Sequence, residues 1–278
     1  MRKPRTTIAG ICAMATATCV TSAHAAPAAL PVPDHIVIVL EENHGYSDVI
    51  GSPQAPYMNA LAQAGALFTD SHAIEHPSQP NYLDLFSGSN QGIHDDSCPH
   101  SFDTANEGSE LLEAGYSFAG YSEDLPEKGS LVCKYGAYAR KHAPWTNFLN
   151  LPKKTNLPFT SFPTNYRKLP TVSWVIPNLD NDMHDGTIKQ ADDWLKNNLK
   201  GYVKWAAKHN SLLILTWDED DRSEGNRIPT IFVGPMVKPG QYGESIDHYN
   251  VLRTILDMYG LAPLGNTQSA KPIKDVWQ

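Results

Sequence analysis

The sequence predicts a three-layer α/β/α domain built around a mostly parallel β-sheet. Short apolar runs at 35–40, 171–176 and 211–217 have the length of strands buried on both faces. Segments with helical spacing of apolar residues, near 56–65 and 191–208, alternate with these runs. Alternating strands and helices are typical of a parallel sheet with helices on both of its faces.

The first half of the domain begins with the strand His35-Ile36-Val37-Ile38-Val39-Leu40. The helix near 56–65 follows, with Tyr57, Met58, Leu61 and Leu67 spaced for one face, and a loop comes next. Ser78-Gln79-Pro80-Asn81 opens another helix, because proline suits the first helical turn, and Ser87-Gly88 ends it. The remaining elements of this half are a helix around 109–114 and a strand over 115–121.

The second half follows a loop-rich stretch at about 122–168 that contains several prolines and aromatic residues. A strand over 171–176 leads to a helix over 191–208, whose apolar residues form one buried stripe. Strands over 211–217 and 228–233 follow, and a final amphipathic helix begins at His248. These elements predict a single domain over residues 26–278 with an insertion at 122–168.

The first 25 residues have the pattern of a secretory signal peptide. Arg2, Lys3 and Arg5 precede a mildly apolar stretch over 8–20, and Ala23-His24-Ala25 provides a cleavage site. The apolar stretch is shorter than the roughly 20 residues of a membrane-spanning helix. We therefore expect a secreted or periplasmic protein without a stable membrane anchor.

The charge of the chain is acidic. The full sequence has 22 basic and 30 acidic residues, and removing the leader leaves 19 basic residues and a formal charge of −11. Such a charge repels anions at long range. This predicts no nucleic-acid partner and no adsorption to acidic membranes, although a local cationic or metal-bearing pocket remains compatible with a phosphate ligand.

Two of the four cysteines remain after the leader is removed. Cys12 and Cys19 lie in the leader, which leaves Cys98 and Cys133. An even pair in an oxidising compartment predicts one disulfide bond. The expected bond would pin the long insertion.

Polar clusters stand where the expected strands and helices meet. Glu41-Glu42-Asn43 follows the first strand, and Asp218-Glu219-Asp220-Asp221 follows strand 211–217. Others are His76-Pro77-Ser78, the segment 180–185 and Asp247-His248. Because ligands of open α/β sheets lie beyond the carboxyl ends of the strands, these clusters are expected to converge. Carboxylates and imidazoles suit a divalent metal ion, with oxygen favouring hard ions and histidine extending the choice to zinc, manganese or iron.

Ser78 is the candidate nucleophile. A hydroxyl at a helix start loses its proton more easily beside a cation, and the helix amides can hold a phosphate oxygen. The alternative interpretation is that Ser78 only caps the helix. Asp180 and His184 have simple alternatives too, as parts of a short acidic loop, and His248 as an ordinary residue at a helix start.

Three other classes of site lack their motifs. An EF-hand calcium loop is excluded because Arg222 and Ser223 stand where a ligand and a glycine are needed. Gly115-Tyr116-Ser117 and Gly120-Tyr121-Ser122 do not complete the G-x-S-x-G motif of serine hydrolases. The sequence also lacks the glycine-rich phosphate loops of P-loop and dinucleotide-binding folds.

Four motifs, in this order, resemble those of a known family. They are Glu41-Glu42-Asn43, the segment 76–82 (HPSQPNY), Asn181-Asp182-Met183-His184-Asp185 and Thr216-Trp217-Asp218-Glu219. Over about 33–262 the chain is similar to the secreted phosphoesterases, which include acid phosphatases and bacterial phospholipases C of the alkaline phosphatase superfamily. The resemblance implies an alkaline-phosphatase-like sheet and a phosphoserine intermediate.

The resemblance also implies roles for individual residues. Ser78 would attack phosphorus, and His142, in Arg140-Lys141-His142-Ala143-Pro144, would face the substrate phosphate together with Asn81. His184 would face the phosphate and either protonate the leaving group or, with Asp180 or Asp182 and His248, hold a second metal. The implied metal ligands are Glu42, Asn43, Ser78, Asp218 and Glu219, and those of a second metal are Asp180, Asp182 and His248. Asp218-Glu219 departs from the Asp-His pair of many superfamily members, which leaves the number of metals open.

The sequence thus predicts an exported, metal-dependent acid phosphatase that hydrolyses phosphate monoesters through a phosphoserine. The metal would be Mg, Mn, Zn, Ca or Fe, and the substrate a small phosphate ester or a phospholipid head group. A phospholipase C-type phosphodiesterase is the alternative, which the short chain disfavours. A non-catalytic phosphate- or metal-binding protein is a further alternative, and Ser78 speaks against it because a pure binder needs no nucleophile.

Overall fold

The computed structural model describes residues 1, 4 and 30–278. Apart from Met1 and Pro4, the predicted signal peptide lies outside these residues. Within the described part of the chain, no helix combines the length and apolar character needed to cross a bilayer.

An eight-stranded sheet forms the centre of the molecule, in the order β10-β2-β9-β8-β1-β7-β3-β6. Strand β9 runs antiparallel to both of its neighbours, and the other strand pairs are parallel. The predicted mostly parallel α/β sheet is therefore confirmed. The strands are β1 (His35–Glu41), β2 (Ala66–His72), β3 (Phe118–Ser122), β6 (Asn156–Pro158), β7 (Val172–Ile176), β8 (Ser211–Trp217), β9 (Thr230–Val233) and β10 (Gly240–Asp247).

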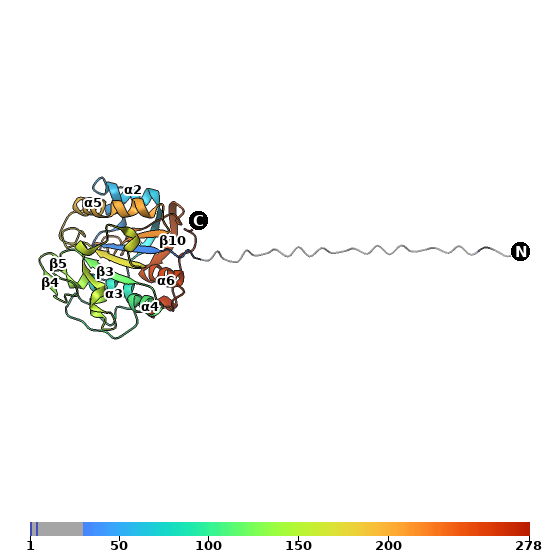
Figure 1. The fold of residues 1–278 in the computed structure, drawn as a ribbon. Coiled ribbons are helices and arrows are strands. Elements are labelled where there is room, and N and C mark those ends of the chain that lie inside the picture. Colours follow the sequence, from blue (N-terminus) through green and yellow to red (C-terminus); the bar gives the residue numbers. More distant parts are fainter. Residues whose placement is uncertain (2–3, 5–29) are drawn as a thin grey trace.

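Helices cover both faces of this sheet, as Figure 1 shows. One face carries α2 (Pro56–Ala64) and α5 (Ile188–Ala206), and the other carries α3 (Ser78–Ser87), α4 (Glu107–Glu113) and α6 (His248–Met258). Short elements complete the fold: α1 (Tyr46–Val49), the separate hairpin β4 (Lys134–Tyr135) and β5 (Tyr138–Ala139), and the 3₁₀ turns η1 (Arg140–His142), η2 (Pro144–Asn147), η3 (Lys153–Thr155), η4 (Phe159–Ser161), η5 (Tyr166–Lys168) and η6 (Gly265–Gln268).

Alternation along β1 builds the two cores. Ile36, Ile38 and Leu40 pack into the core beneath α3, α4 and α6, whereas Val37 and Val39 pack into the core beneath α2 and α5. Successive side chains of a strand point to opposite faces, so a continuous apolar run is what a strand buried on both sides requires. Strand β1 is thus packed on both faces, and the polar residues that follow its carboxyl end are held in place by this packing.

Three strands of the central sheet, β2, β6 and β10, were not predicted. Leu67 belongs to β2 rather than to the preceding helix, because the chain turns at Gly65, where a Cβ atom would lie 2.1 Å from the Phe232 carbonyl oxygen. Strand β10 is mostly exposed at the edge of the sheet. An exposed edge strand leaves no apolar run in the sequence.

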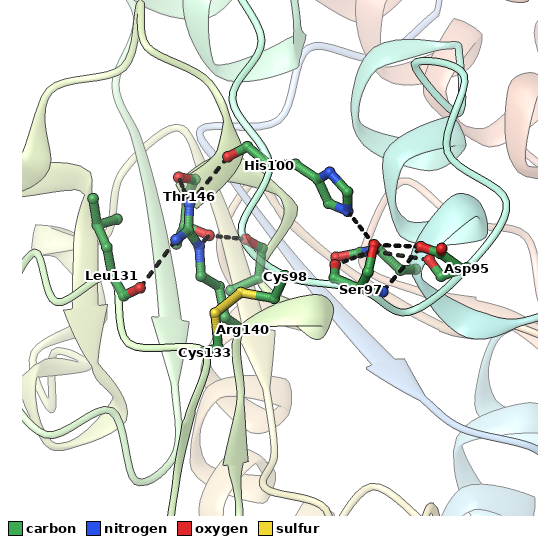
Figure 2. The surroundings of a disulfide bond; sticks show 10 residues. Asp95, Ser97, Cys98, His100, Leu131, Cys133, Arg140 and Thr146 are labelled. Atoms are coloured by element: carbon green, nitrogen blue, oxygen red, sulfur yellow. Dashed lines mark hydrogen bonds between the residues drawn. A yellow bond between two sulfur atoms is a disulfide. The ribbon is translucent and has the colours of Figure 1, made fainter.

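The insertion consists of short turns rather than a long irregular loop. Cys98 and Cys133 form a disulfide bond, as the even cysteine count predicts. Figure 2 shows Arg140 beside this bond, where its guanidinium donates hydrogen bonds to the carbonyl oxygens of Leu131, His100 and Thr146. The disulfide and Arg140 together hold the insertion against the segment around residue 100.

Candidate active site

The carboxyl ends of β1, β7 and β8 lie side by side and place the polar clusters together. The Glu42 amide donates a hydrogen bond to the Asp182 carbonyl oxygen (2.7 Å), and the Asp218 amide donates to the Glu41 carbonyl oxygen (3.0 Å). Three segments distant in sequence are thus joined by backbone bonds at one edge of the sheet. This is the convergence expected of a parallel sheet.

Ser78 is the first residue of α3, where it faces the end of β1. The N-cap position is occupied by Pro77, which makes no side-chain cap, so Ser78 is not the helix cap. Its side chain instead donates a hydrogen bond to Glu42 Oε2 at 3.0 Å, and the residue is 2% exposed. The structure therefore does not support the alternative in which Ser78 caps the helix, and it directs the Ser78 hydroxyl at a carboxylate.

Glu42 is the centre of the hydrogen-bonding network. Besides Ser78, it accepts a hydrogen bond from the Tyr82 hydroxyl (2.6 Å) and lies 3.0 Å from His142 Nε2. Burial alone raises the pKa of Glu42, but the charge and hydrogen bond of His142, with the charge of Lys141, lower this pKa to about 2. Glu42 is therefore a permanent carboxylate despite its complete burial.

His142 lies between two carboxylates. Its Nδ1 atom is 3.1 Å from Asp182 Oδ2, opposite the contact with Glu42, and its ring stacks on Tyr82 with centroids 4.9 Å apart. Burial lowers the pKa of His142, but Glu42 and Asp182 more than offset this and raise the pKa to about 9. The ring is thus a fixed imidazolium beneath the site.

Asp218 and Glu219 form an acidic pair on the other side of Glu42. Asp218 Oδ1 accepts hydrogen bonds from the amides of Asn43 and Glu219, whereas Oδ2 is buried without a partner. Glu219 Oε2 is 2.7 Å from His76 Nδ1 but is not aligned for a hydrogen bond. Burial raises the pKa of both residues, and the negative charge of Glu42 raises it further, for Glu219 to about 8.

This donor set fits a hard divalent cation. Buried carboxylate oxygens of Asp218 and Glu219 lack protein hydrogen bonds, and they repel Glu42. A cation would remove both penalties, because carboxylate, amide and hydroxyl oxygens are the ligands that such ions prefer. Of the predicted ligands, Glu42, Ser78, Asp218 and Glu219 are buried, whereas Asn43 is placed beside Asp218 by its backbone amide.

One arrangement of side chains in the described residues satisfies the distance requirement of a metal site. In the part of the chain that the structure describes, Glu42, His142 and His184 bring ligand atoms within 4.8 Å of one another. Both ring nitrogens of His142 already face carboxylates, and its raised pKa keeps them protonated. In the absence of a metal ion the ring of His142 is therefore positively charged, and Glu42 is common to both sets of candidate ligands.

The residues predicted to hold a second metal are used differently. Asp182 orients His142 and accepts a hydrogen bond from the His184 amide at 2.9 Å. His248 Nε2 is 2.9 Å from the Asp218 carbonyl oxygen, and burial lowers the pKa of this ring. Asp180 is exposed. The structure therefore does not bring these three side chains together.

The two remaining predicted residues differ in accessibility. Asn81 is buried, and its side chain bonds to backbone groups of Ile74, Glu75 and Pro77, so it shapes the loop that precedes Ser78. His184 is partly exposed, with Nδ1 2.8 Å from Asp185 Oδ1 and its ring centroid 5.7 Å from that of His142. His184 lies at the entrance of the site.

The site contains residues that the sequence analysis did not single out. Tyr82 links Glu42 to His142, and Lys141 Nζ lies 2.7 Å from Asp96 Oδ2 and 3.2 Å from His184 Nε2. Asp96 also accepts a hydrogen bond from the Gln79 amide, in the first turn of α3. Tyr82 and Lys141 are sequence neighbours of the predicted residues Asn81 and His142, and this proximity could have identified them. No sequence feature identifies Asp96.

Comparison with known proteins assigns the chain to a family. The Phosphoesterase family matches residues 51–262. A Mycobacterium tuberculosis protein named phosphatidylinositol-3-phosphatase is 52% identical over 255 residues, which cover 91% of this chain and 85% of that protein. A phosphate-repressible acid phosphatase of Penicillium chrysogenum is 30% identical over 228 residues, which cover 75% of this chain but only 55% of the fungal protein.

Solved structures with low sequence identity share the fold. A Vibrio parahaemolyticus protein of the alkaline phosphatase superfamily superposes with a TM-score of 0.60 at 14% identity, covering 89% of this chain and 73% of that one. A phosphonate monoester hydrolase from Silicibacter pomeroyi gives a TM-score of 0.58 at 11% identity, with coverages of 86% and 76%. The chain belongs to the Phosphoesterase family and has the fold of the alkaline phosphatase superfamily.

Proposed function

We propose that this protein is an exported, metal-dependent phosphomonoesterase that works through a phosphoserine at Ser78. The observation that carries the proposal is the buried hydrogen bond from the Ser78 hydroxyl to Glu42 at the first turn of α3. A non-catalytic binder has no use for a nucleophile held in this way. The relatives named as phosphatases support the same conclusion.

In the first step, Ser78 Oγ forms a bond to phosphorus while the bond from phosphorus to the leaving alcohol breaks. Glu42, which accepts the Ser78 hydrogen bond, orients the hydroxyl, and the proton of the hydroxyl passes to water. A divalent cation held by Glu42, Asn43, Ser78, Asp218 and Glu219 would lower the pKa of the hydroxyl and neutralise phosphate oxygens. The amides at the start of α3 stabilise the negative charge of the phosphoryl group.

The histidines act on the other side of the phosphoryl group. His142 is held as an imidazolium by Glu42 and Asp182 and supplies positive charge toward the phosphate. His184, at the entrance, donates the proton that the leaving alkoxide needs. In the second step, a water molecule attacks phosphorus, the Ser78 oxygen leaves, and phosphate is released.

The substrate that we propose is the phosphate monoester of a phosphoinositide. The 52% identical mycobacterial relative is named for phosphatidylinositol 3-phosphate, and the matched residues cover 85% of that protein. A monoester leaves the phosphoryl group with a single organic substituent, which suits a deeply buried nucleophile. The proposed place of action is outside the cytoplasm. Export would remove the signal peptide after Ala25, so we expect the mature protein to begin at Ala26.

Phosphate release from p-nitrophenyl phosphate tests this function, with wild type beside Ser78→Ala and with bis-p-nitrophenyl phosphate in parallel. We expect turnover of the monoester. Chelation should abolish this turnover, and a divalent metal should restore it. The Ser78→Ala variant should turn over the monoester at least about a thousandfold more slowly than wild type. Full activity of Ser78→Ala would contradict the nucleophile. Preference for the diester would replace the phosphatase with a phospholipase C-type activity.

A further inference from the structure

We propose that the insertion forms a docking platform for the surface of an anionic lipid bilayer. The platform comprises the exposed residues of the segment 128–135 together with Leu149, Lys153 and Lys154. This inference rests on the proposed function and extends it, because it states how the enzyme would reach a phosphate ester that stays in a membrane.

Exposed apolar side chains gather on this platform. Among the described residues, the large hydrophobic side chains that are exposed include Leu131 (45%), Val132 (41%), Tyr135 (58%) and Leu149 (71%), and the others are Met1 and Val32 near the N-terminus. Leu131, Leu149 and Lys153 line one common hollow. Isolated exposed apolar residues need no explanation, but Leu131 and Leu149 share a hollow, and Val132 and Tyr135 lie within four residues of Leu131 in the sequence.

The platform also concentrates positive charge in an acidic protein. The insertion over 122–168 contains eight basic and three acidic residues, whereas the rest of the chain after the leader has a formal charge of −16. Lys128, Lys134, Lys153 and Lys154 are exposed. The net charge predicted no adsorption to acidic membranes, but this local distribution reverses the expectation for one face. Basic residues with interspersed apolar and tyrosine side chains match the interface of an anionic bilayer.

The platform is braced rather than loose. The disulfide from Cys133 to Cys98 and the hydrogen bond from Arg140 to the Leu131 carbonyl oxygen fix its apolar part, as Figure 2 shows. On its other side, the Gly129 amide donates to the Asn156 carbonyl oxygen at 2.8 Å. A braced surface can present apolar side chains to a membrane without the entropy cost of ordering them first.

The platform adjoins the entrance of the site. Strands β4 and β5 lie at the margin of the molecule opposite the C-terminus in Figure 1, and β5 leads directly into η1, which carries Lys141 and His142. The Leu179 amide donates a hydrogen bond to the Ala137 carbonyl oxygen at 3.0 Å, joining the hairpin to the loop that carries His184. A bilayer seated on the platform would therefore lie beside the entrance, with its head groups near Lys141 and His184.

Sedimentation with vesicles tests the platform without any turnover. The mature protein is mixed with vesicles of phosphatidylcholine alone, or with one third phosphatidylserine, and the bound fraction is measured. We expect the wild-type protein to bind the anionic vesicles. Binding should weaken at least about fivefold for each lysine replaced in Lys153→Glu/Lys154→Glu, and it should also weaken in Leu131→Asn/Tyr135→Ser. The matched control, Lys200→Glu/Lys204→Glu on the exposed face of α5, should bind like wild type.

A kinetic comparison separates docking from catalysis. Hydrolysis of a water-soluble, short-chain phosphatidylinositol 3-phosphate should be unchanged in the platform variants. Hydrolysis of long-chain phosphatidylinositol 3-phosphate in anionic vesicles should fall with vesicle binding. Wild type that fails to hydrolyse either form, yet still binds anionic vesicles, would overturn the proposed function and leave the platform standing.

Three outcomes would overturn the platform itself. One is the absence of vesicle binding by the wild-type protein. Another is equal binding to neutral and anionic vesicles, which would exclude an anionic surface as the partner. The third is an equal loss of binding in the α5 control, because that would reflect total charge rather than a defined face.

Discussion

At the level of single side chains, Tyr82 joins the two charges of the site. Its hydroxyl donates to Glu42 at 2.6 Å while its ring stacks on His142. We expect Tyr82→Phe to keep the stacking and the packing but to lower kcat about tenfold with little change in KM, since it removes one hydrogen bond to a charged group. Tyr138→Phe is the control, because its buried hydroxyl has no protein partner. Equal effects of the two variants on kcat would contradict this role of Tyr82.

Glu107 offers a pH-dependent prediction away from the chemistry. This buried residue of α4 accepts a hydrogen bond from Trp174 Nε1 at 2.6 Å, and burial raises its pKa from 4.5 to about 8. Between these values the folded protein holds a proton that the unfolded chain has released, so stability falls as pH rises. We expect Glu107→Gln to gain free energy of unfolding relative to wild type across this window, by up to about 1.4 kcal/mol per pH unit.

Urea unfolding between pH 5 and pH 8 measures this difference. Glu113→Gln, an exposed substitution on the same helix, is the control and should keep a constant offset from wild type. A gap between Glu107→Gln and wild type that does not widen with pH would show that Glu107 is ionised in the folded protein.

At the level of elements, the disulfide joins two segments that both approach the site. Cys98 follows the loop of Asp96, which contacts Gln79 and Lys141, and Cys133 precedes the hairpin that leads to Lys141. The bond closes a separation of 35 residues. Replacing both cysteines by alanine should lower the free energy of unfolding by about 3 to 4 kcal/mol through loop entropy.

Loss of the disulfide bond should also lower turnover, because the bond fixes the contact between Asp96 and Lys141 beside the site. Wild type treated with a reductant under mild denaturation should match the double alanine variant in unfolding midpoint. The reductant should leave the variant itself unchanged. An unfolding midpoint equal in wild type and variant would contradict a stabilising role for the disulfide.

The elements that sequence reasoning found are those with buried apolar runs or helical spacing. Strands β1, β7 and β8 and helix α5 are of this kind, and the predicted ranges differ from the observed ones by only a few residues. Strand β10 was missed because an exposed edge strand carries no such pattern. Strand β2 was missed because the end of helix α2 at Gly65 depends on a close approach to Phe232, which only the tertiary structure supplies.

The site residues, too, were predictable where they adjoin a strand or helix with a clear sequence pattern, and were not predictable where they lie in loops. Glu42, Ser78 and Asp218 were predictable because each ends a recognisable strand or begins a helix, and parallel strands bring such positions together. The partnership of Asp182 with His142 was not predictable, because His142 lies in an insertion without periodicity. Asp96 reaches Lys141 from a loop for the same reason.

At the level of the whole molecule, the proposed metal site predicts that metal binding is coupled to folding. Asp218 is fully buried beside Glu42 and Glu219, and burial together with these two negative charges raises the pKa of Asp218, so its ionisation costs free energy in the protein without metal. We expect a divalent metal to stabilise the fold by about 2.7 kcal/mol at a hundredfold excess over its Kd. Asp218→Asn should raise the stability of the chelated protein by about 1 to 2 kcal/mol, lose most of the gain from metal, and lose activity.

Thermal unfolding with and without metal checks this coupling. Asp103→Asn removes one exposed negative charge far from these residues in sequence and serves as the control, with the metal response of wild type. If Asp218→Asn were less stable than wild type after chelation, the cluster would not be a source of repulsion, and the oxygen-donor metal site would lose its physical basis.

The central claim is that Ser78 carries the phosphoryl group during turnover. Acid quenching of the enzyme within its first turnovers, followed by mass spectrometry of the peptide that contains Ser78, tests it most directly. We predict one phosphoryl group on Ser78 in wild type during hydrolysis of p-nitrophenyl phosphate, and none in Ser78→Ala. Continued turnover by wild type with no phosphorylated peptide at any quench time, together with undiminished activity of Ser78→Ala, would contradict the account.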